Sequence, residues 1–246
     1  MKQVLVALAL AAAAAARAGE VQVAVAANFA GPLTRIGEAF AAATGHQLKV
    51  SSGATGKFYT QIVSGAPFEV LIAADDETPR RLVAEGHAVA GTNFTYATGR
   101  LVLWSAQPGL VDGDGAVLAS AQVKHVAIAN PKVAPYGAAA LEVIKARGLT
   151  EAVTPKLVTA ESIAQAYQFA FTGNAELGFV ALSQVAVPGK PVQGSYWLVP
   201  TRFHREIRQD AVLLRTGEKN PAAAALLAYL KSDAARAVIK DFGYGE

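Results

Sequence analysis

The sequence predicts an α/β fold with two lobes. Strand patterns alternate with helix patterns, the alternation starts again midway along the chain, and the last two helical patterns have little sheet of their own. Those helices would pack against a sheet if the chain returned to the first set of elements. We therefore expect lobe I at residues 19–98 plus 205–246 and lobe II at 99–204. Two crossing segments, near 95–101 and 199–210, would join the lobes and act as hinges.

The first set of elements begins with the apolar strand pattern VQVAVAAN at 21–28. The next pattern, at 32–45, is typical of a helix that ends at Gly45, because its apolar residues recur at helical spacing. The patterns that follow are the strand QLKVSS, the helix KFYTQIVSG, the strand FEVLIAAD and the helix TPRRLVAEG. Strands that alternate with helices favour a parallel sheet.

The second set of elements begins with the strand RLVLWSA at 100–106. It continues with the strand HVAIANP, the helices GAAALEVIKARG and SIAQAYQFAFTG, and the strand ELGFVAL at 176–182. The Pro/Gly-rich run AVPGKPVQGSYWLVP is then expected to interrupt the pattern. An alternating strand, REIRQDAVLLRTG, and two helices over about 220–241 complete the chain.

Residues 1–18 have the features of a secretory signal peptide. Lys2 gives the positive start, Val4 to Ala16 form the apolar run, and Ala16-Arg17-Ala18 has the small-x-small pattern of a cleavage site. The sequence thus predicts an exported protein that is soluble after cleavage, with 246 minus 18, or 228, residues.

Charge and composition exclude several classes of function. Without Lys2 and Arg17, the 22 basic residues fall to 20 against 19 acidic ones, and no basic run indicates nucleic-acid binding. There is no cysteine, so disulfides and thiolate metal sites are excluded. The four histidines are scattered without metal-ligand spacing, and we expect them at the surface. No nucleophile–base motif is present, which favours a binding protein over an enzyme.

Three polar positions stand where a helix is predicted to begin. Asn28 follows the first strand, Thr55 follows the second, and Ser162 has capping-box spacing to Gln165. Each is compatible with a purely structural cap. Because ligands of open α/β sheets lie beyond the carboxyl ends of the strands, these positions could instead converge on one cleft. Free amides at helix starts suit an anion.

The turn Gly53-Ala54-Thr55-Gly56-Lys57 is not a nucleotide-binding P-loop. That motif needs a glycine five residues before its Gly-Lys pair and a hydroxyl after the lysine. Here these positions hold Ser51 and Phe58. A small anion remains compatible with the turn, with the Lys57 side chain expected to point to solvent.

Several segments together resemble the periplasmic molybdate-binding proteins of ABC importers. They are VAVAANFAGPL, SSGATGKFYTQIVSGAPFEVLIAADDETPRRL, FTYATGRLVLWS, IANPKVAPYG and ELGFVAL, which follow in order over essentially all of the chain after the signal peptide. The resemblance implies a two-lobe, type II-like solute-binding fold that closes on molybdate or tungstate. It implies a periplasmic monomer, without a cofactor, that delivers its ligand to a membrane permease driven by a cytoplasmic ATPase.

The resemblance also implies which residues bind the oxyanion. They are Ala27, Asn28, Thr55, Tyr136 and Ile163. All are uncharged, so the anion would be held by neutral hydrogen-bond donors, with no metal ion coordinated directly.

The chain departs from the family pattern at three of these positions. One branch has alanine in place of Tyr136 and takes its tyrosine from the position of Ala181, whereas another branch shares the Pro-Tyr-Gly turn seen here. Thr55 replaces the usual serine. Asn28 replaces a hydroxyl residue, so either its side chain or the neighbouring amides could donate.

Two alternatives remain open from the sequence. A sulfate- or phosphate-type carrier would use a similar anion site. An exported phosphoryl-transfer hydrolase is a different class, and the lack of a metal cluster or nucleophile–base pair weighs against it.

Overall fold

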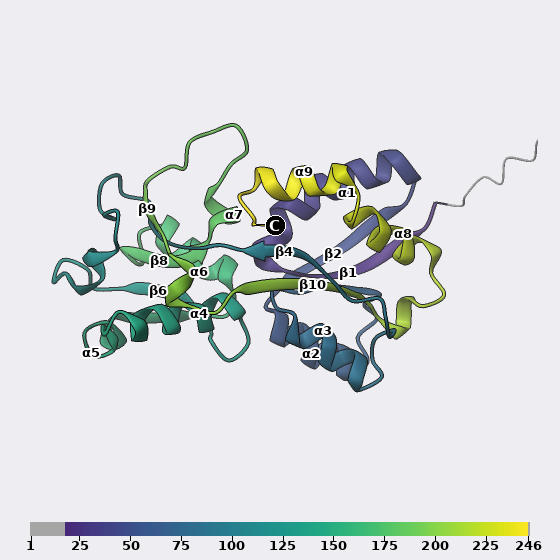
Figure 1. The fold of residues 1–246 in the computed structure, drawn as a ribbon, viewed down its shortest axis with the longest axis horizontal. Coiled ribbons are helices and arrows are strands. Elements are labelled where there is room, and N and C mark those ends of the chain that lie inside the picture. The colour runs from purple at the N-terminus through teal and green to yellow at the C-terminus, as the bar shows by residue number, and fades with distance from the viewer. Residues whose placement is uncertain (1–17, 246) are drawn as a thin grey trace, which may run out of the picture.

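The computed structural model describes residues 18–245 and has two lobes, each built on its own five-stranded sheet (Figure 1). The predicted signal peptide at 1–18 lies outside the described residues, apart from Ala18. Among the described residues, no helix has the length and apolar character needed to cross a bilayer. The predicted fold class, an α/β protein with two lobes joined by two crossing segments, is confirmed.

Lobe I is the part built on the sheet with strand order β2-β1-β3-β10-β4. Its strands are β1 (Glu20–Ala26), β2 (Gln47–Gly53), β3 (Val70–Ile72), β4 (Phe94–Gly99) and β10 (Ile207–Leu213). Its helices are α1 (Ala30–Thr44), α2 (Thr55–Val63), α3 (Glu77–Ala84), α8 (Pro221–Leu230) and α9 (Asp233–Asp241), with the 3-10 turns η1 (Ala27–Phe29) and η5 (Arg215–Gly217). Helices α1, α8 and α9 cover one face of the sheet, and α2 and α3 cover the other (Figure 1).

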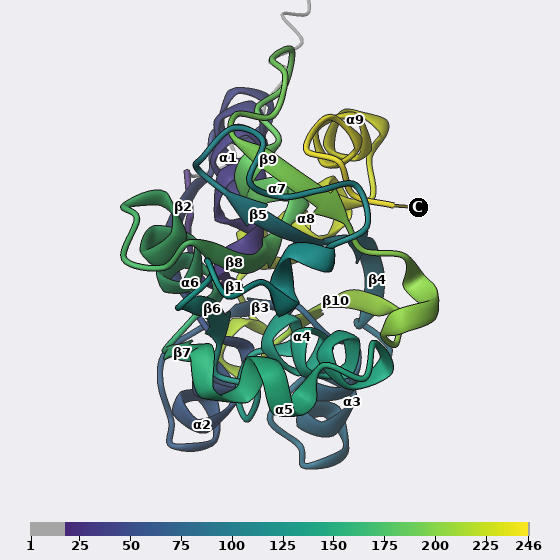
Figure 2. The same cartoon turned by 90° about the vertical axis from the view of Figure 1, so that its left-hand side faces the viewer.

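Lobe II is the part built on the sheet with strand order β7-β6-β8-β5-β9. Its strands are β5 (Leu101–Ser105), β6 (Val126–Ala129), β7 (Leu157–Ala160), β8 (Leu177–Ala181) and β9 (Ser195–Leu198). Its helices are α4 (Pro135–Ala146), α5 (Thr150–Val153), α6 (Ile163–Phe171) and α7 (Leu182–Val185), with the 3-10 turns η2 (Ala116–Ala119), η3 (Thr154–Lys156) and η4 (Thr201–Phe203). Figure 2 shows this lobe from its outer end.

The prediction of a parallel sheet is wrong for one side of each lobe. In lobe I, β1 pairs in parallel with β2 and β3, but β10 is antiparallel to both β3 and β4. In lobe II, β6 is parallel to β7 and β8, whereas β5 is antiparallel to β8 and β9. The Pro/Gly-rich run also holds a strand, β9, where an interruption was predicted.

Both faces of the central strands are buried, which explains their continuous apolar runs. In β5, Leu101 and Leu103 pack into one hydrophobic cluster of lobe II, and Val102 and Trp104 pack into a second cluster on the opposite face. Helix α1 ends where the sequence predicts, because Gly45 adopts the left-handed conformation (φ 75°) that closes a helix.

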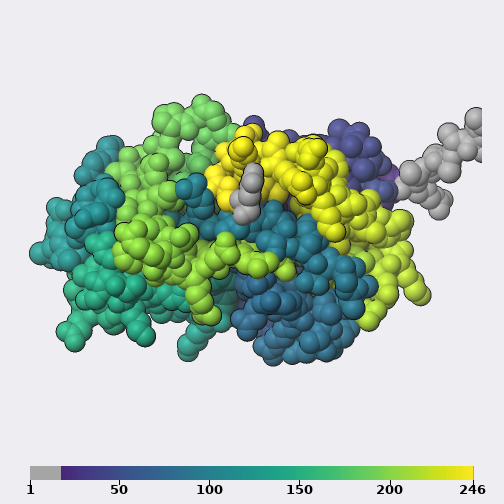
Figure 3. Space-filling view, in the orientation of Figure 1, coloured from purple at the N-terminus to yellow at the C-terminus, as the bar shows by residue number. Residues whose placement is uncertain are grey.

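Two segments carry the chain between the lobes. β4 leads directly into β5 through Arg100, and η4 leads from β9 towards β10. The second segment, yellow-green in Figure 3, crosses the front of the molecule. The end of the chain returns to the same place, because Gly245 exchanges two main-chain hydrogen bonds with Thr98 of β4 (2.9 and 3.1 Å).

Candidate functional site

A small cavity lies between the lobes, at the carboxyl ends of their parallel strands. Its volume, taken as the space open to the centre of a water-sized sphere, is about 10 Å³. This leaves room for one compact group and not for a nucleotide or a sugar. All five residues predicted to bind the ligand line it: Ala27, Asn28, Thr55, Tyr136 and Ile163. Its lining includes no charged side chain.

Each of the five residues stands at the start of a helix or 3-10 turn that follows a strand. Ala27 and Asn28 form η1 after β1, and Thr55 is the first residue of α2 after β2. Tyr136 is the second residue of α4, and Ile163 is the first of α6. The first N–H groups of a helix have no partner within it, so these helix starts direct free donors towards the cavity.

Thr55 is almost fully buried, and its hydroxyl has a defined orientation. Its Oγ1 accepts a hydrogen bond from the main-chain N–H of Ala74 at 3.0 Å. An oxygen that accepts this bond still carries its own proton. The Thr55 hydroxyl can therefore donate into the cavity, which Ala74 also lines.

Tyr136 has a buried hydroxyl that remains protonated. Burial raises the pKa of Tyr136 well above its ordinary value, and the hydrogen bond from Gln209 only partly offsets the rise. The bond from Gln209 joins its Nε2 to the phenol oxygen over 3.0 Å. A neutral phenol can donate to an anion, whereas a phenolate would repel it.

Asn28 connects the cavity to a buried network. Its Nδ2 donates to Gln209 Oε1 (2.9 Å) and to the Tyr244 hydroxyl (3.0 Å), and its main-chain oxygen accepts from Ser183 of lobe II (2.8 Å). Its Oδ1 is buried and has no hydrogen-bond partner among the described residues. Because both side-chain N–H groups of Asn28 are bonded to neighbours, its side chain has no N–H group left for a ligand. Of the two possibilities that the sequence left open, this favours donation by the main-chain amides.

Ile163 contributes through the start of α6. The predicted cap is present: Ser162 Oγ accepts from Gln165 N at 3.4 Å. Gln165 does not complete the reciprocal bond of a capping box, because its Oε1 accepts instead from Glu161 N (2.7 Å). The main-chain oxygen of Ile163 accepts from Gln184, which fixes this turn beside the cavity.

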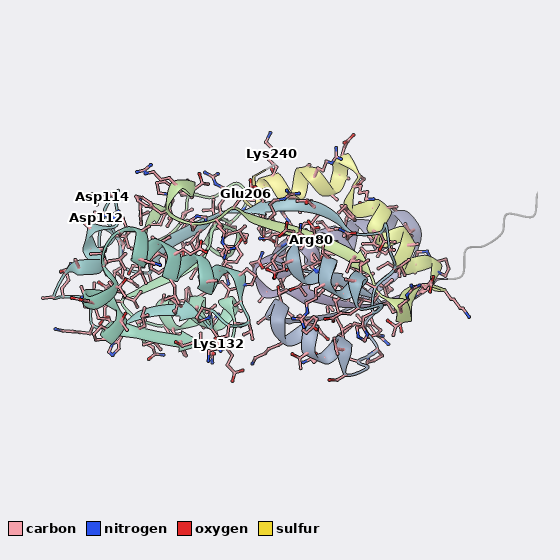
Figure 4. The ribbon with its side chains drawn as sticks, turned by 60° about the horizontal axis from the view of Figure 1, so that its bottom comes forward. Arg80, Asp112, Asp114, Lys132, Glu206 and Lys240 are labelled. Atoms are coloured by element: carbon pink, nitrogen blue, oxygen red, sulfur yellow. The ribbon has the colours of Figure 1, made fainter. Side chains whose placement is uncertain are left out.

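Charged residues gather outside the cavity, at the mouth of the cleft. A larger space of about 370 Å³ there is lined by both signs of charge: Asp75, Asp76, Glu77, Lys132, Glu142, Arg205, Glu206 and Arg208. Figure 4 labels Lys132 and Glu206 near the boundary between the lobes. Among the described residues, no group of three or more His, Asp or Glu side chains could hold a metal ion.

The Lys57 side chain is exposed, as predicted, and its Nζ also forms an ion pair with Glu161 Oε2 of lobe II over 2.8 Å. The prediction that all four histidines lie at the surface is wrong, since His46 and His204 are buried. His46 Nδ1 accepts from Gly19 N at 3.0 Å, and this bond and the packing against Phe40 explain its burial.

The ion pair between Lys57 and Glu161 should stabilise contact between the lobes weakly, because both side chains are substantially exposed (45% and 77%). Lys57→Ala and Glu161→Ala should each lower ligand affinity by no more than a few-fold. The exchanged pair, Lys57→Glu with Glu161→Lys, should bind like the wild type. Titrations at low and moderate salt measure this, and a loss of two orders of magnitude in Lys57→Ala would instead make Lys57 a direct ligand.

Asp75 should make stability depend on pH. Burial raises the pKa of this carboxyl, against the lowering effect of hydrogen bonds from Thr78. A carboxyl with a raised pKa holds its proton more tightly in the folded state, so its contribution is most favourable below the unfolded pKa and is lost as pH rises through the folded one. Asp75→Asn should therefore raise the melting temperature more at pH 7 than at pH 4, by a few degrees, since 1 kcal/mol corresponds to about 2–4 °C at this size.

Asp76→Asn is the matched control for this measurement. The Asp76 carboxylate lies 3.0 Å from Arg80, so its neutralisation removes an ion pair and should not raise stability. An equal rise in melting temperature for Asp75→Asn at both pH values would show that ionisation of Asp75 does not affect stability.

The residues that sequence reasoning missed are those behind the cavity. Gln209, Tyr96, Tyr244 and Ser183 form the buried network around Asn28 and Tyr136. They come from β10, β4, the end of the chain and α7, and none belongs to a motif. No local signal marked Gln209, which lies between Arg208 and Asp210 in the polar first half of β10.

Comparison with known proteins places this site in a family. The family described as bacterial extracellular solute-binding protein matches residues 21–245. The molybdate-binding protein ModA of Azotobacter vinelandii is 60% identical over 226 residues, which cover 92% of this chain and 90% of that protein. ModA of Rhodobacter capsulatus is 54% identical over 226 residues, covering 92% of this chain and 88% of that protein.

A solved structure agrees with these relatives. The periplasmic molybdate-binding protein of Azotobacter vinelandii superposes with a TM-score of 0.90 at 41% identity, covering 92% of this chain and 99% of that one. The chain therefore belongs to the bacterial extracellular solute-binding protein family, in the branch that includes these molybdate-binding proteins.

Proposed function

We propose that the chain is the substrate-binding component of a molybdate ABC importer. The observation that carries the proposal is the small cavity between the lobes, whose uncharged lining includes the five predicted residues at four helix or turn starts. A tetrahedral dianion can be held there by main-chain amides and by the hydroxyls of Thr55 and Tyr136. Each bond to a charged acceptor is worth about 1.5–3 kcal/mol net. The names of the relatives are consistent with this ligand.

The proposal extends to tungstate, which has the same charge and shape as molybdate. Sulfate is also a tetrahedral dianion but is smaller, so donors fixed for the longer bonds of molybdate would be stretched around it. The protein would work in the periplasm as a monomer without a cofactor or catalytic activity, and would deliver its ligand to a membrane permease with a cytoplasmic ATPase.

We also infer that the lobes open and close about the two crossing segments. Several hydrogen bonds join the lobes directly, among them Gly56 N to Val133 O (2.9 Å) and Ser183 Oγ to Asn28 O (2.8 Å). Hinge closure around a ligand is the usual way such a site fills.

Calorimetric titration of ligand-free protein with molybdate, tungstate, sulfate and phosphate tests the function. We expect tight binding of molybdate and tungstate, and binding of sulfate and phosphate that is weaker by at least two orders of magnitude. Elemental analysis of the purified protein for molybdenum and tungsten would identify a retained ligand. Equal or tighter binding of sulfate or phosphate would reassign the protein to the corresponding carrier class, and turnover of a phosphate ester would make it an enzyme.

A further inference from the structure

We propose that Gln209 is a positioning residue of the oxyanion site and fixes the Tyr136 hydroxyl as a donor to the bound anion. Gln209 lies on β10 of lobe I and is fully buried, with no exposed surface. The inference rests on the proposed function, because it concerns the same cavity. It adds a residue that does not line that cavity and does not touch the ligand.

The hydrogen bonds of Gln209 reach a predicted ligand residue from each lobe. Its Nε2 donates to the Tyr136 oxygen at 3.0 Å, and its Oε1 accepts from Asn28 Nδ2 at 2.9 Å. Oε1 also lies 2.8 Å from the Tyr96 hydroxyl. One amide thereby sets the orientation of groups on opposite sides of the cavity.

The direction of the bond to Tyr136 decides what its hydroxyl can do. An amide nitrogen can only donate, so the phenol oxygen must accept and its own proton must point elsewhere. The hydrogen bonds of the described residues include none in which Tyr136 donates, and Tyr136 lines the cavity. A fully deprotonated oxyanion in the cavity is the acceptor that completes this chain of bonds.

The backbone around Gln209 is shaped to admit this contact. The register between β10 and β4 shifts at Gln209 and Asp210, and such a bulge re-aims a side chain. On β4, Gly99 leaves the necessary space: a Cβ at that position would lie 2.3 Å from the Tyr136 oxygen and 2.4 Å from Gln209 Nε2. Two features from different strands therefore make room for one hydrogen bond.

Gln209 also suits the charge of the ligand. As a neutral amide it orients the phenol without adding a charge near the anion. A glutamate at the same position would, when ionised, accept the Tyr136 proton and repel the oxyanion. When protonated it could again donate to the phenol oxygen.

The test combines calorimetry with molybdate and a double-mutant cycle. Tyr136→Phe should lower affinity roughly ten- to a hundredfold, because one charge-assisted bond is lost. Gln209→Met, which keeps the length of the side chain but cannot donate, should lower affinity at least fivefold in the wild-type background. In the Tyr136→Phe background it should have little further effect, because its action passes through the hydroxyl.

Gln209→Glu gives a readout that a purely structural role would not change. A buried glutamate titrates well above its ordinary range, by up to about 3–5 units. Its affinity for molybdate should therefore be at least tenfold higher at pH 6 than at pH 8.5, whereas the wild type should change little over this range. Gln107→Glu, which adds the same charge at an exposed position, is the matched control.

Three outcomes would overturn the inference. Additive effects of Gln209→Met and Tyr136→Phe would show that Gln209 acts independently of the hydroxyl. A Gln209→Glu variant whose affinity for molybdate does not change with pH would show the same. If Tyr136→Phe left the affinity for molybdate unchanged, the reverse arrangement would hold, with Tyr136 donating to Gln209 and the Asn28 amide nitrogen facing the anion. This outcome can be measured even if the Gln209 variants fail to fold. Failure of the wild type to bind molybdate would instead contradict the proposed function.

Discussion

Gly56→Ala should lower the affinity for molybdate roughly a hundredfold while leaving the ligand-free protein at least as stable. Gly56 is the second residue of α2, and its N–H donates to Val133 O of lobe II at 2.9 Å. A Cβ there would lie 2.9 Å from Val133 Cα and 3.1 Å from Val133 O. The lobes could then meet only by losing this bond and straining the contact, at a combined cost of about 2–4 kcal/mol.

The same substitution should not harm lobe I by itself. Alanine is a better helix former than glycine by about 1 kcal/mol, so the melting temperature without ligand should stay level or rise. Calorimetry gives the affinity, and small-angle scattering gives the radius of gyration, which should fall on adding molybdate to the wild type but not to the variant. Gly113→Ala is the control, since a Cβ there meets nothing within 4 Å. Unchanged affinity and normal compaction in Gly56→Ala would refute closure through this contact.

Thr55→Val should reduce both ligand affinity and stability. The hydroxyl has two roles: it can donate to the oxyanion, and its oxygen accepts from the buried N–H of Ala74 at 3.0 Å. Loss of a bond to a charged acceptor lowers affinity roughly ten- to a hundredfold. The unpaired Ala74 N–H costs a further 1–3 kcal/mol or so of folding free energy, which is a drop of several degrees in melting temperature.

Thr55→Ser is the matched variant, because it keeps the hydroxyl and removes only the methyl group. It should bind molybdate nearly as well as the wild type, and it should reject sulfate less strongly, since the cavity gains room. Titrations and melting curves of both variants measure these effects. If Thr55→Ser loses as much affinity as Thr55→Val, the methyl group and not the hydroxyl is what the site requires.

Local sequence patterns predicted where Asn28 and Thr55 would lie, because such patterns determine where helices begin, whereas the full set of five candidate residues came from the family resemblance. A strand that runs into a helix leaves its connecting residues at the carboxyl edge of the sheet, so Asn28 and Thr55 were expected to share a cleft. The structure places them, with Tyr136 and Ile163, around one cavity. This convergence follows from strand direction alone, without knowledge of side-chain contacts.

Contacts between distant segments could not be predicted in the same way. Gln209 is 73 residues from Tyr136 and 181 from Asn28, and a bulge in β10 determines where it points. The Lys57–Glu161 pair depends on the approach of two lobes, which no local pattern encodes. The antiparallel strands were missed because β4 passes straight into β5 without an intervening helix, so alternation gave no signal there.

The order of strands has a consequence for how the chain acquires its structure. The strands of lobe II come from one continuous stretch, β5 to β9, whereas the sheet of lobe I holds β10 between β3 and β4. Lobe I thus cannot complete its sheet until residues beyond 206 are available. Contacts within a continuous stretch need shorter loops to close, so lobe II can form first. During synthesis or export, the half of the chain that starts first is therefore the half that finishes folding last.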